Sequence, residues 1–225
     1  MKKKLWNFCR RVLSILLNLA VVWMEPTAAR LSWEAVGTQM FTFYTENSNF
    51  FTAGVCLLMA LFQLKALLTG REIPLWVKRL KFIATCCLTM TFMTVVLVLA
   101  PYCQEEGGVV FLLTASSMLY HHLLNPLCAF VSLVFLEREP RLSGRNVFCA
   151  LLPTLLYGSI AVYANVRRWI AGPYPFLLVY EQSVRQSAEW LVAIVCMNLL
   201  YAWLVWKAGG NGKKKHPGLL FRKTA

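Results

Sequence analysis

The sequence predicts an all-α membrane protein, a bundle of six transmembrane helices that forms one domain. Of its 225 residues, 58% are hydrophobic, whereas soluble domains are about 45–50% apolar. The apolar residues gather in six runs, and about 20 apolar residues are needed to cross a bilayer as a helix. Strand-like alternation of apolar and polar residues is missing from these runs, so the pattern favours helices over a transmembrane β-barrel.

The six expected spans cover residues 12–29, 41–68, 82–101, 109–136, 147–166 and 188–207. The first run is short and ends near Glu25 and Pro26 unless residues 27–29 extend it. Its basic start is typical of a signal peptide, but no clear small-residue cleavage site follows, so we interpret it as an uncleaved helix. The second and fourth runs exceed the bilayer thickness and are expected to tilt or to begin in the interface.

The charged residues lie between the apolar runs and indicate the topology. The net charge is +13, from 23 Lys and Arg against 10 acidic residues. The Lys and Arg residues form no basic helix face or aromatic-basic module, so a nucleic-acid partner is not expected. If both termini are cytoplasmic, external segments contain only Arg30, Arg167, Arg168 and Arg185. The positive-inside rule therefore favours cytoplasmic termini.

The chain is expected to form a transmembrane domain over residues 1–208, followed by a basic tail over residues 209–225. Gly and Lys dominate the tail, which predicts a disordered segment close to anionic lipid. The eight Cys are scattered without a CxxC motif, and a disulfide framework is not expected.

Polar residues inside the fourth run mark a candidate site, because an ionisable side chain within a span is costly and usually functional. His121 and His122 are adjacent and therefore point about 100° apart on a helix. Asn125 follows them by one turn and can share a face with either. A His pair can also ligate haem or a metal, but no Cys or carboxylate stands at a suitable spacing, so no metal or cofactor is expected.

The second run opens with a dense polar patch. Thr45, Ser48, Asn49 and Thr52 follow i, i+3, i+4, i+7 spacing and so lie on one helix face. Ser and Thr in membrane helices commonly bond to their own or a neighbouring helix, which is the structural interpretation. The catalytic interpretation is that His122 takes a proton from the Thr45 hydroxyl, since a hydroxyl nucleophile needs an adjacent base.

Three segments occur together in order: FYTENSNFF at residues 43–51, YHHLLNP at residues 120–126 and GPYPF at residues 172–176. Their order and spacing resemble the membrane family of the androgen-induced and androgen-dependent TFPI-regulating proteins, most closely its small bacterial relatives with six spans. The resemblance implies an intramembrane hydrolase in a bacterial cell membrane. It would cleave fatty-acid esters of hydroxy fatty acids, or similar lipid esters, with a Thr nucleophile and a His.

Carried onto this chain, the resemblance implies that Thr45 is the nucleophile, with Thr42 as the alternative if the alignment shifts. It implies that His122 is the base, because His122 stands four residues before Pro126. The two are expected to face each other in a central cavity near the external side. The candidates for supporting polar groups or oxyanion donors are Ser48, Asn49 and Asn125. The residues expected at the cavity mouth are Tyr174, Pro175 and Phe176.

The expected function is therefore intramembrane hydrolysis of lipid esters, with membrane lipids and a hydrophobic ester as partners and without a cofactor. The alternative is a non-catalytic membrane protein that binds a lipid or a small solute. A bis-His haem protein is a third hypothesis and predicts a coloured sample. The sequence does not indicate an oligomeric state.

Overall fold

The computed structural model describes residues 2–211, with the side chains of residues 2 and 3 left out. Within this range the elements are helical, and six helices are long and apolar enough to cross a membrane. They are Lys4–Thr42, Tyr44–Thr69, Leu75–Cys103, Leu119–Leu136, Arg145–Val166 and Val184–Ala208. The prediction of an all-α bundle with six spans is confirmed, and the protein is a multi-pass integral membrane protein. Of the predicted basic tail, residues 212–225 lie outside the described range.

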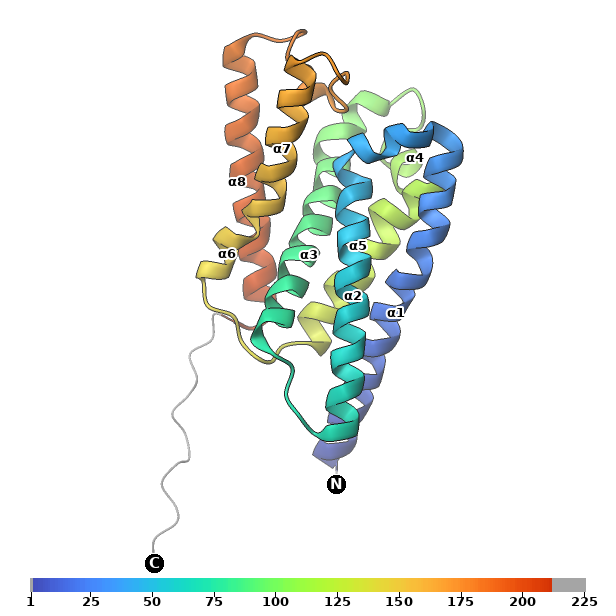
Figure 1. The fold of residues 1–225 in the computed structure, drawn as a ribbon, viewed down its shortest axis with the longest axis vertical. Helices are drawn as coiled ribbons and strands as arrows, with labels where there is room; N and C mark the ends of the chain where they lie inside the picture. The colour runs from blue at the N-terminus through green and yellow to red at the C-terminus, as the bar shows by residue number, and fades with distance from the viewer. Residues whose placement is uncertain (1, 212–225) are drawn as a thin grey trace, which may run out of the picture.

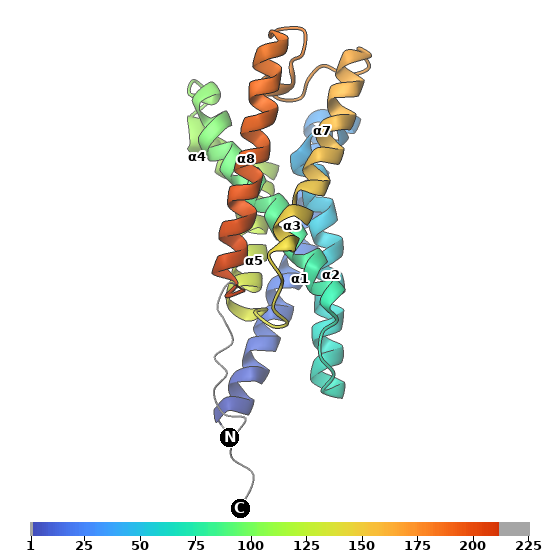
Figure 2. The same ribbon diagram turned by 90° about the vertical axis from the view of Figure 1, so that its left-hand side faces the viewer.

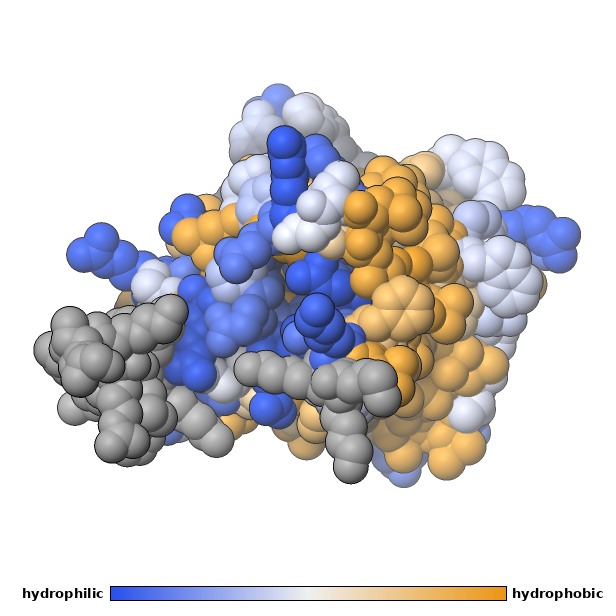
Figure 3. Space-filling model, turned by 90° about the horizontal axis from the view of Figure 1, so that it is seen from below, coloured by the Kyte–Doolittle hydropathy of each residue, from blue (hydrophilic) through white to orange (hydrophobic). Residues whose placement is uncertain are grey.

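The helices run up and down between two ends (Figure 1). The lower end contains the start of α1 (Lys2–Val36) and the end of α2 (Tyr44–Thr69), and the Gly37–Thr42 turn and the start of α8 (Val184–Ala208) lie in the upper part. Hydrophilic residues gather across the lower end, with hydrophobic surface beside them (Figure 3). Large apolar side chains such as Leu68 and Leu152 are exposed on the outer helix faces, as expected where lipid is the solvent.

The first span extends further than expected. Helix α1 continues through Pro26 to Val36 instead of ending near residue 29. Proline inside a helix removes one backbone hydrogen bond, but neighbouring helices tolerate such a proline in a membrane bundle. As a result Glu25, which the sequence placed near the end of a span, lies inside the bundle and is only 3% exposed.

The second and third spans are α2 (Tyr44–Thr69) and α3 (Leu75–Thr94). A 3-10 turn, Gly37–Thr42, links α1 to α2. Helix α3 continues into a π-helical segment, Val95–Leu99, and a 3-10 turn, Ala100–Cys103. Helix α1 packs against α2, and α2 packs against α3, so these three helices place the polar start of α2 beside the core of the bundle.

The fourth run differs from the continuous helix that was expected over residues 109–136. A short helix, α4 (Gly108–Thr114), is followed by extended Ala115 and by Ser116 with a φ of 47°. The span proper begins at Leu119 with a π-helical segment, Leu119–Leu124, continues as α5 (Asn125–Val131) and ends in a second π-helical segment, Ser132–Leu136. The break places the two His residues in the first turns of the span.

The last two spans are α6 (Arg145–Cys149) with α7 (Leu151–Val166), and α8. A capping box formed by Ser183 and Gln186 starts α8. Helix α6 packs on α8, whereas α7 and α8 lie farther apart toward the upper end (Figure 2). This divergence leaves space between α7, α8 and the remainder of the bundle.

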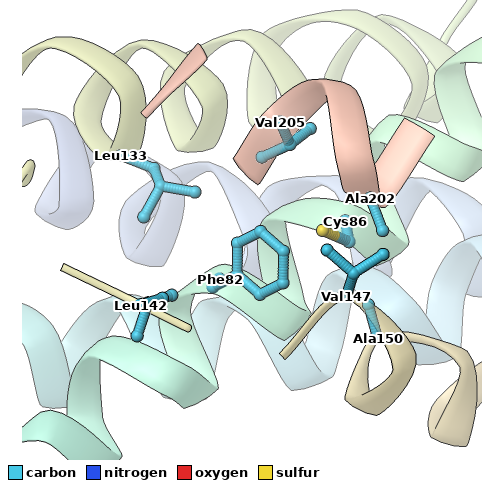
Figure 4. Packing of buried hydrophobic residues seen from close by; sticks show 8 residues of the cluster. All are labelled: Phe82, Cys86, Leu133, Leu142, Val147, Ala150, Ala202 and Val205. Carbon is cyan, nitrogen blue, oxygen red and sulfur yellow. The ribbon is translucent and has the colours of Figure 1, made fainter. Parts of the chain in front are cut away.

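A compact hydrophobic cluster holds the lower half of α8 against the bundle (Figure 4). Phe82 and Cys86 of α3 meet Ala202 and Val205 of α8 in this cluster. Its other buried members are Leu133, Leu142, Val147 and Ala150. The cluster fixes the lower half of α8 against α3. The upper halves of α7 and α8 diverge around the candidate site (Figure 2).

Candidate functional site

A cavity of about 460 Å³ lies between α2, α3, α7, α8 and the loop before α8. Ligand pockets in proteins are typically about 300–1,000 Å³ and mostly apolar. The apolar part of the lining comes from Met90, Val95, Leu99, Leu151, Leu155, Val162, Phe176, Leu177, Val179, Val184, Ala188, Trp190, Leu191, Ile194 and Val195. Several of these side chains, including Leu155 and Leu191, are exposed, so the cavity is open to the surroundings of the bundle.

The Thr45 side chain lies at the polar part of this lining. Thr45 is 8% exposed and occupies the first turn of α2, where backbone N–H groups have no partner within the helix. The Tyr174 hydroxyl oxygen accepts the Thr45 N–H at 3.3 Å and lies 3.4 Å from Thr45 Oγ1. The Tyr174 hydroxyl thus provides an acceptor for a free N–H group at the start of α2 and positions the Thr45 hydroxyl.

The Tyr174 ring is held by aromatic neighbours. It stacks on Phe176 with ring centroids 5.1 Å apart and meets Phe43 edge-on at 6.0 Å. Phe176 in turn contacts Trp190 of α8. Gly172 is required in this loop, because a Cβ there would collide with the Leu177 carbonyl group.

Burial raises the pKa of Tyr174 to about 12, although its hydrogen bonds to Thr45 act in the opposite direction. The phenol therefore stays neutral at physiological pH. A neutral phenol can donate or accept a hydrogen bond at Thr45, but it is too weak a base to remove the threonine proton.

A second, smaller cavity of about 330 Å³ lies on the other side of an aromatic pair. The rings of Tyr44 and Tyr157 meet edge-on at 5.2 Å, and both residues line both cavities. The Tyr44 hydroxyl lies 3.0 Å from Thr154 Oγ1, and the Tyr157 hydroxyl donates to the Thr42 carbonyl oxygen at 2.7 Å. These contacts attach α7 to the start of α2.

Where α1, α2 and the fourth span meet lies a polar cluster that we call the upper cluster: Glu25, Ser32, Glu46, Asn49, His121 and Asn125. His121 Nε2 is 3.4 Å from Glu25 Oε1, and His121 Nδ1 is 3.9 Å from Glu46 Oε1. Asn125 Nδ2 donates to Glu25 Oε2 and to Asn49 Oδ1, each at 3.0 Å. All six residues are buried.

The π-helical segment Leu119–Leu124 explains one link of this cluster. Pro126 has no N–H, and the Asn125 N–H bonds to the Tyr120 carbonyl instead of the His121 carbonyl. The freed His121 carbonyl oxygen accepts from Asn49 Nδ2 at 3.3 Å, and the same amide donates to the Thr45 carbonyl at 2.9 Å. Asn49 thereby connects the Thr45 turn to the histidine segment.

His122 points elsewhere. Its Nδ1 lies 2.6 Å from the Leu112 carbonyl oxygen. A carbonyl only accepts, so Nδ1 carries the proton and Nε2 of the neutral ring keeps its lone pair. His122 is not among the lining residues of the cavity that contains Thr45. In the described part of the chain, no hydrogen bond joins Thr45 to His122.

The remaining predicted site residues occupy distinct places. Ser48 Oγ lies 3.2 Å from Thr91 Oγ1 of α3, and Thr42 Oγ1 donates to the Gln39 carbonyl at 2.7 Å. Tyr174 and Phe176 line the cavity, whereas Pro175 begins the 3-10 turn Pro175–Leu177 behind it. The structure thus brings Thr45 together with Tyr174, and Asn49 together with Asn125.

A lower cluster of buried polar residues was not predicted: Ser14, Asn18, Cys56, Gln63, Lys81 and Glu137. Lys81 Nζ donates to Asn18 Oδ1 at 2.7 Å and contacts Cys56 Sγ at 3.0 Å. Glu137 Oε1 accepts from Ser14 Oγ at 2.8 Å and from Asn18 Nδ2 at 2.7 Å. This network links α1, α2, α3 and the end of the fourth span.

Sequence reasoning gave no role to Glu25, Glu46 or Lys81. The first apolar run was expected to end near Glu25, and Lys81 lies just before the third expected span, residues 82–101. One signal in the sequence was available: Lys78, Lys81 and Thr85 share a helix face through i, i+3, i+7 spacing. Across the described residues, no group of three or more His, Cys or acidic side chains is arranged to hold a metal ion.

A search with protein-family models, curated protein sequences and solved structures found no match to this chain.

Proposed function

We propose that this membrane protein binds an uncharged amphipathic lipid, with the acyl chain in the cavity between α7 and α8 and the polar group beside Thr45 and Tyr174. The observation that supports this most is the lining itself. It is apolar over most of its extent and has hydroxyl groups near the start of α2. Such an arrangement matches a molecule with an apolar chain and a single polar end.

The polar groups of the lining also define the chemistry of the head group. None of the described lining residues carries a formal charge. A charged head group would lose its hydration without gaining an ion pair. Thr45, Tyr174 and Gln182 offer hydroxyl and amide groups that can both donate and accept. An ester, an alcohol or a monoacylglycerol-like head group meets these requirements.

A large side chain introduced at a lining residue would fill the cavity and so test whether the lipid binds there. Gly158 lines the cavity, and a Cβ at this position would meet no atom within 4 Å. Gly158→Phe should therefore occupy the cavity without disturbing its walls. Gly54→Phe on α2 is the matched control, because Gly54 is exposed, equally free of neighbours and outside the cavity.

Native mass spectrometry of the detergent-purified protein gives the readout. Wild type and Gly54→Phe should retain an added monoacylglycerol at one site, and Gly158→Phe should lose at least about tenfold in affinity, which is about 1.4 kcal/mol. Equal retention by all three proteins would contradict binding in this cavity.

A second candidate function is hydrolysis of an ester bound in the same cavity. The observation that favours it is the tautomer of His122, whose Nδ1–H is held by a carbonyl oxygen so that Nε2 can accept a proton. In this proposal a movement of the His122 segment brings Nε2 to Thr45 Oγ1, which attacks the ester carbonyl carbon. The acyl-enzyme forms as the alcohol leaves with the proton, and water then releases the acid. The supporting donors would be Asn49, Asn125 or Ser48.

Labelling with a fluorophosphonate probe tests hydrolysis separately from binding. Hydrolysis predicts that wild type and Thr42→Ala are labelled and that Thr45→Ala and His122→Ala are not. Thr42 is the matched control, because its hydroxyl bonds within its own turn. Labelling that persists in Thr45→Ala would eliminate the nucleophile. If the wild type is not labelled but still binds monoacylglycerol, hydrolysis is contradicted and lipid binding is the remaining function.

We further propose that both termini are cytoplasmic and that the upper end faces outward in a bacterial cell membrane. All but four of the 23 Lys and Arg lie in segments that this orientation places inside. A green fluorescent protein fused to the C-terminus should then fluoresce, whereas a fused alkaline phosphatase should be inactive. An active alkaline phosphatase fusion with a non-fluorescent green fluorescent protein fusion would show that the C-terminus is external and would contradict the proposed topology.

A further inference from the structure

The upper cluster contains more acid than it can neutralise. Two carboxylates, Glu25 and Glu46, face one imidazole, His121. If all three groups were unprotonated, the cluster would have a charge of −2, and one proton on His121 would still leave −1. Within the described residues, no Lys or Arg forms an ion pair with either carboxylate. An uncompensated charge at such a depth costs several kcal/mol.

In the part of the chain that the structure describes, three buried polar atoms of Glu25, Glu46 and His121 make no hydrogen bond. Glu25 Oε1, Glu46 Oε2 and His121 Nε2 are buried and accept or donate no hydrogen bond. The exposed fractions of the three residues are 3%, 9% and 1%, so the three side chains lie inside the bundle. Buried polar groups are almost always hydrogen-bonded. Glu25 Oε1 and His121 Nε2 lie 3.4 Å from each other, so a proton on either atom would provide the missing donor between them.

We propose that Glu25, Glu46 and His121 form an intramembrane proton-binding site that holds two protons at neutral pH, so that at least one of the two carboxyl groups is protonated. Two protons make the cluster neutral as a carboxylic acid beside a carboxylate–imidazolium pair. A proton on Glu25 Oε1 or on His121 Nε2 also supplies a donor across the 3.4 Å that separates these atoms.

The groups around the site do not offer another counter-charge. Helix α1 contributes Glu25 and Ser32, α2 contributes Glu46 and Asn49, and Asn125 of α5 is neutral. Ser32 Oγ donates to Glu46 Oε1 at 3.2 Å. The Leu119–Leu124 segment also contains the titratable residues Tyr120 and His122, and His122 bonds to the Leu112 carbonyl. Among the described residues, helix α3 forms no ion pair or hydrogen bond with the cluster. Its Thr91 contacts Ser48 instead.

The arrangement suits protons better than a metal ion. Both ring nitrogens of His121 face a carboxylate oxygen, one on each side. Each ring nitrogen thus has one carboxylate within ion-pair distance, at 3.4 Å and 3.9 Å. The three side chains do not converge on one point as metal ligands do. The proposal is independent of lipid binding, because the cluster lies outside the cavity lining.

Infrared spectroscopy tests the site directly, since only a protonated carboxyl group has an isolated C=O stretching band. The protein would be purified in a detergent without ester groups and measured at about pH 7, well above the ordinary carboxyl range of about 4. Wild type should show the band. Glu25→Gln and Glu46→Gln should each lose it, because the remaining carboxylate pairs with the imidazolium.

Two further variants sharpen the result. His121→Gln should increase the band about twofold, because both acids must then be protonated to stay neutral. Glu34→Gln is the matched control on α1: Glu34 is exposed and pairs with Arg30, so the band should equal that of wild type. Absence of the band in folded wild type, or the same band in all five proteins, would overturn the proposal. Loss of the band in wild type only when Na⁺ is present would also overturn it, in favour of a bound cation.

Discussion

The upper and lower clusters are both buried, both lie where α1, α2 and the fourth span meet, and differ in how their charges are compensated. In the lower cluster one ammonium group, Lys81, and one carboxylate, Glu137, share Asn18 as a common hydrogen-bond partner. Lys78, also buried, adds a positive charge at the start of α3. In the upper cluster two carboxylates compete for one imidazole.

This difference separates a structural role from a chemical one. The lower cluster consists of charges and amides that bond to each other and connect four segments, as expected for polar groups that hold membrane helices together. The upper cluster has two carboxylates and one imidazole, so its acid is in excess. Buried side-chain oxygens without a hydrogen bond occur in both clusters, for example Glu46 Oε2 and Glu137 Oε2. Intramembrane charge that its surroundings do not compensate is the signature of a functional site.

The largest expected effect comes from breaking the lower cluster. Glu137→Ala removes the acceptor of two hydrogen bonds and leaves Lys81, which is 0% exposed, without a nearby carboxylate. Losing one partner of a buried charge network costs about 3–5 kcal/mol. Thermal unfolding in detergent should show a large fall in Tm. Glu139→Ala is the control, because its side chain is 61% accessible, and it should leave Tm unchanged. If Glu137→Ala has the same Tm as wild type and Glu139→Ala, the network has no structural role.

A smaller effect is expected in the upper cluster. Glu46→Gln removes the surplus acid and keeps the shape of the side chain, so the unfolding free energy should change by less than about 1 kcal/mol, or rise. The same thermal unfolding assay measures both clusters. A destabilisation as large as that of Glu137→Ala would show that Glu46 is needed as an ion, and the contrast between the two clusters would fail.

The smallest effect concerns Tyr174 and appears only in base. Its pKa of about 12 lies above the ordinary value of 10.0, because burial disfavours the phenolate. The unfolded chain therefore ionises first, so the stability contribution is complete below about pH 10 and is lost as the pH rises through about 12. The tyrosinate absorbance of wild type minus that of Tyr174→Phe should show the late titration. A difference titration centred at the ordinary value would place Tyr174 in water.

The sequence predicted the six spans because bilayer thickness and hydropathy determine them almost alone. It did not predict the break before Leu119, because that break depends on one left-handed residue, Ser116, in a run that is otherwise apolar enough for a helix. The length of α1 was also missed, since Pro26 ends helices in water but is tolerated when neighbouring helices surround it.

The sequence predicted only part of the candidate site. The resemblance singled out Thr45 and Tyr174, which the structure places in contact. It also singled out Thr45 and His122 as partners, and this remains a prediction that the labelling experiment tests. Glu25 and Lys81 were missed because a charge near the end of an apolar run looks the same whether it faces water or the bundle interior. Only the packing of helices distant in the sequence distinguishes the two cases.

The central claim, that an acyl chain occupies the cavity between α7 and α8, is tested most directly by photo-crosslinking. A monoacylglycerol with a diazirine at its chain end would be bound, irradiated and mapped by peptide mass spectrometry. The account predicts adducts on lining residues such as Leu155 and Ile194 that disappear in Gly158→Phe. Adducts confined to outward residues such as Leu152 of the same helix, unchanged in Gly158→Phe, would contradict it.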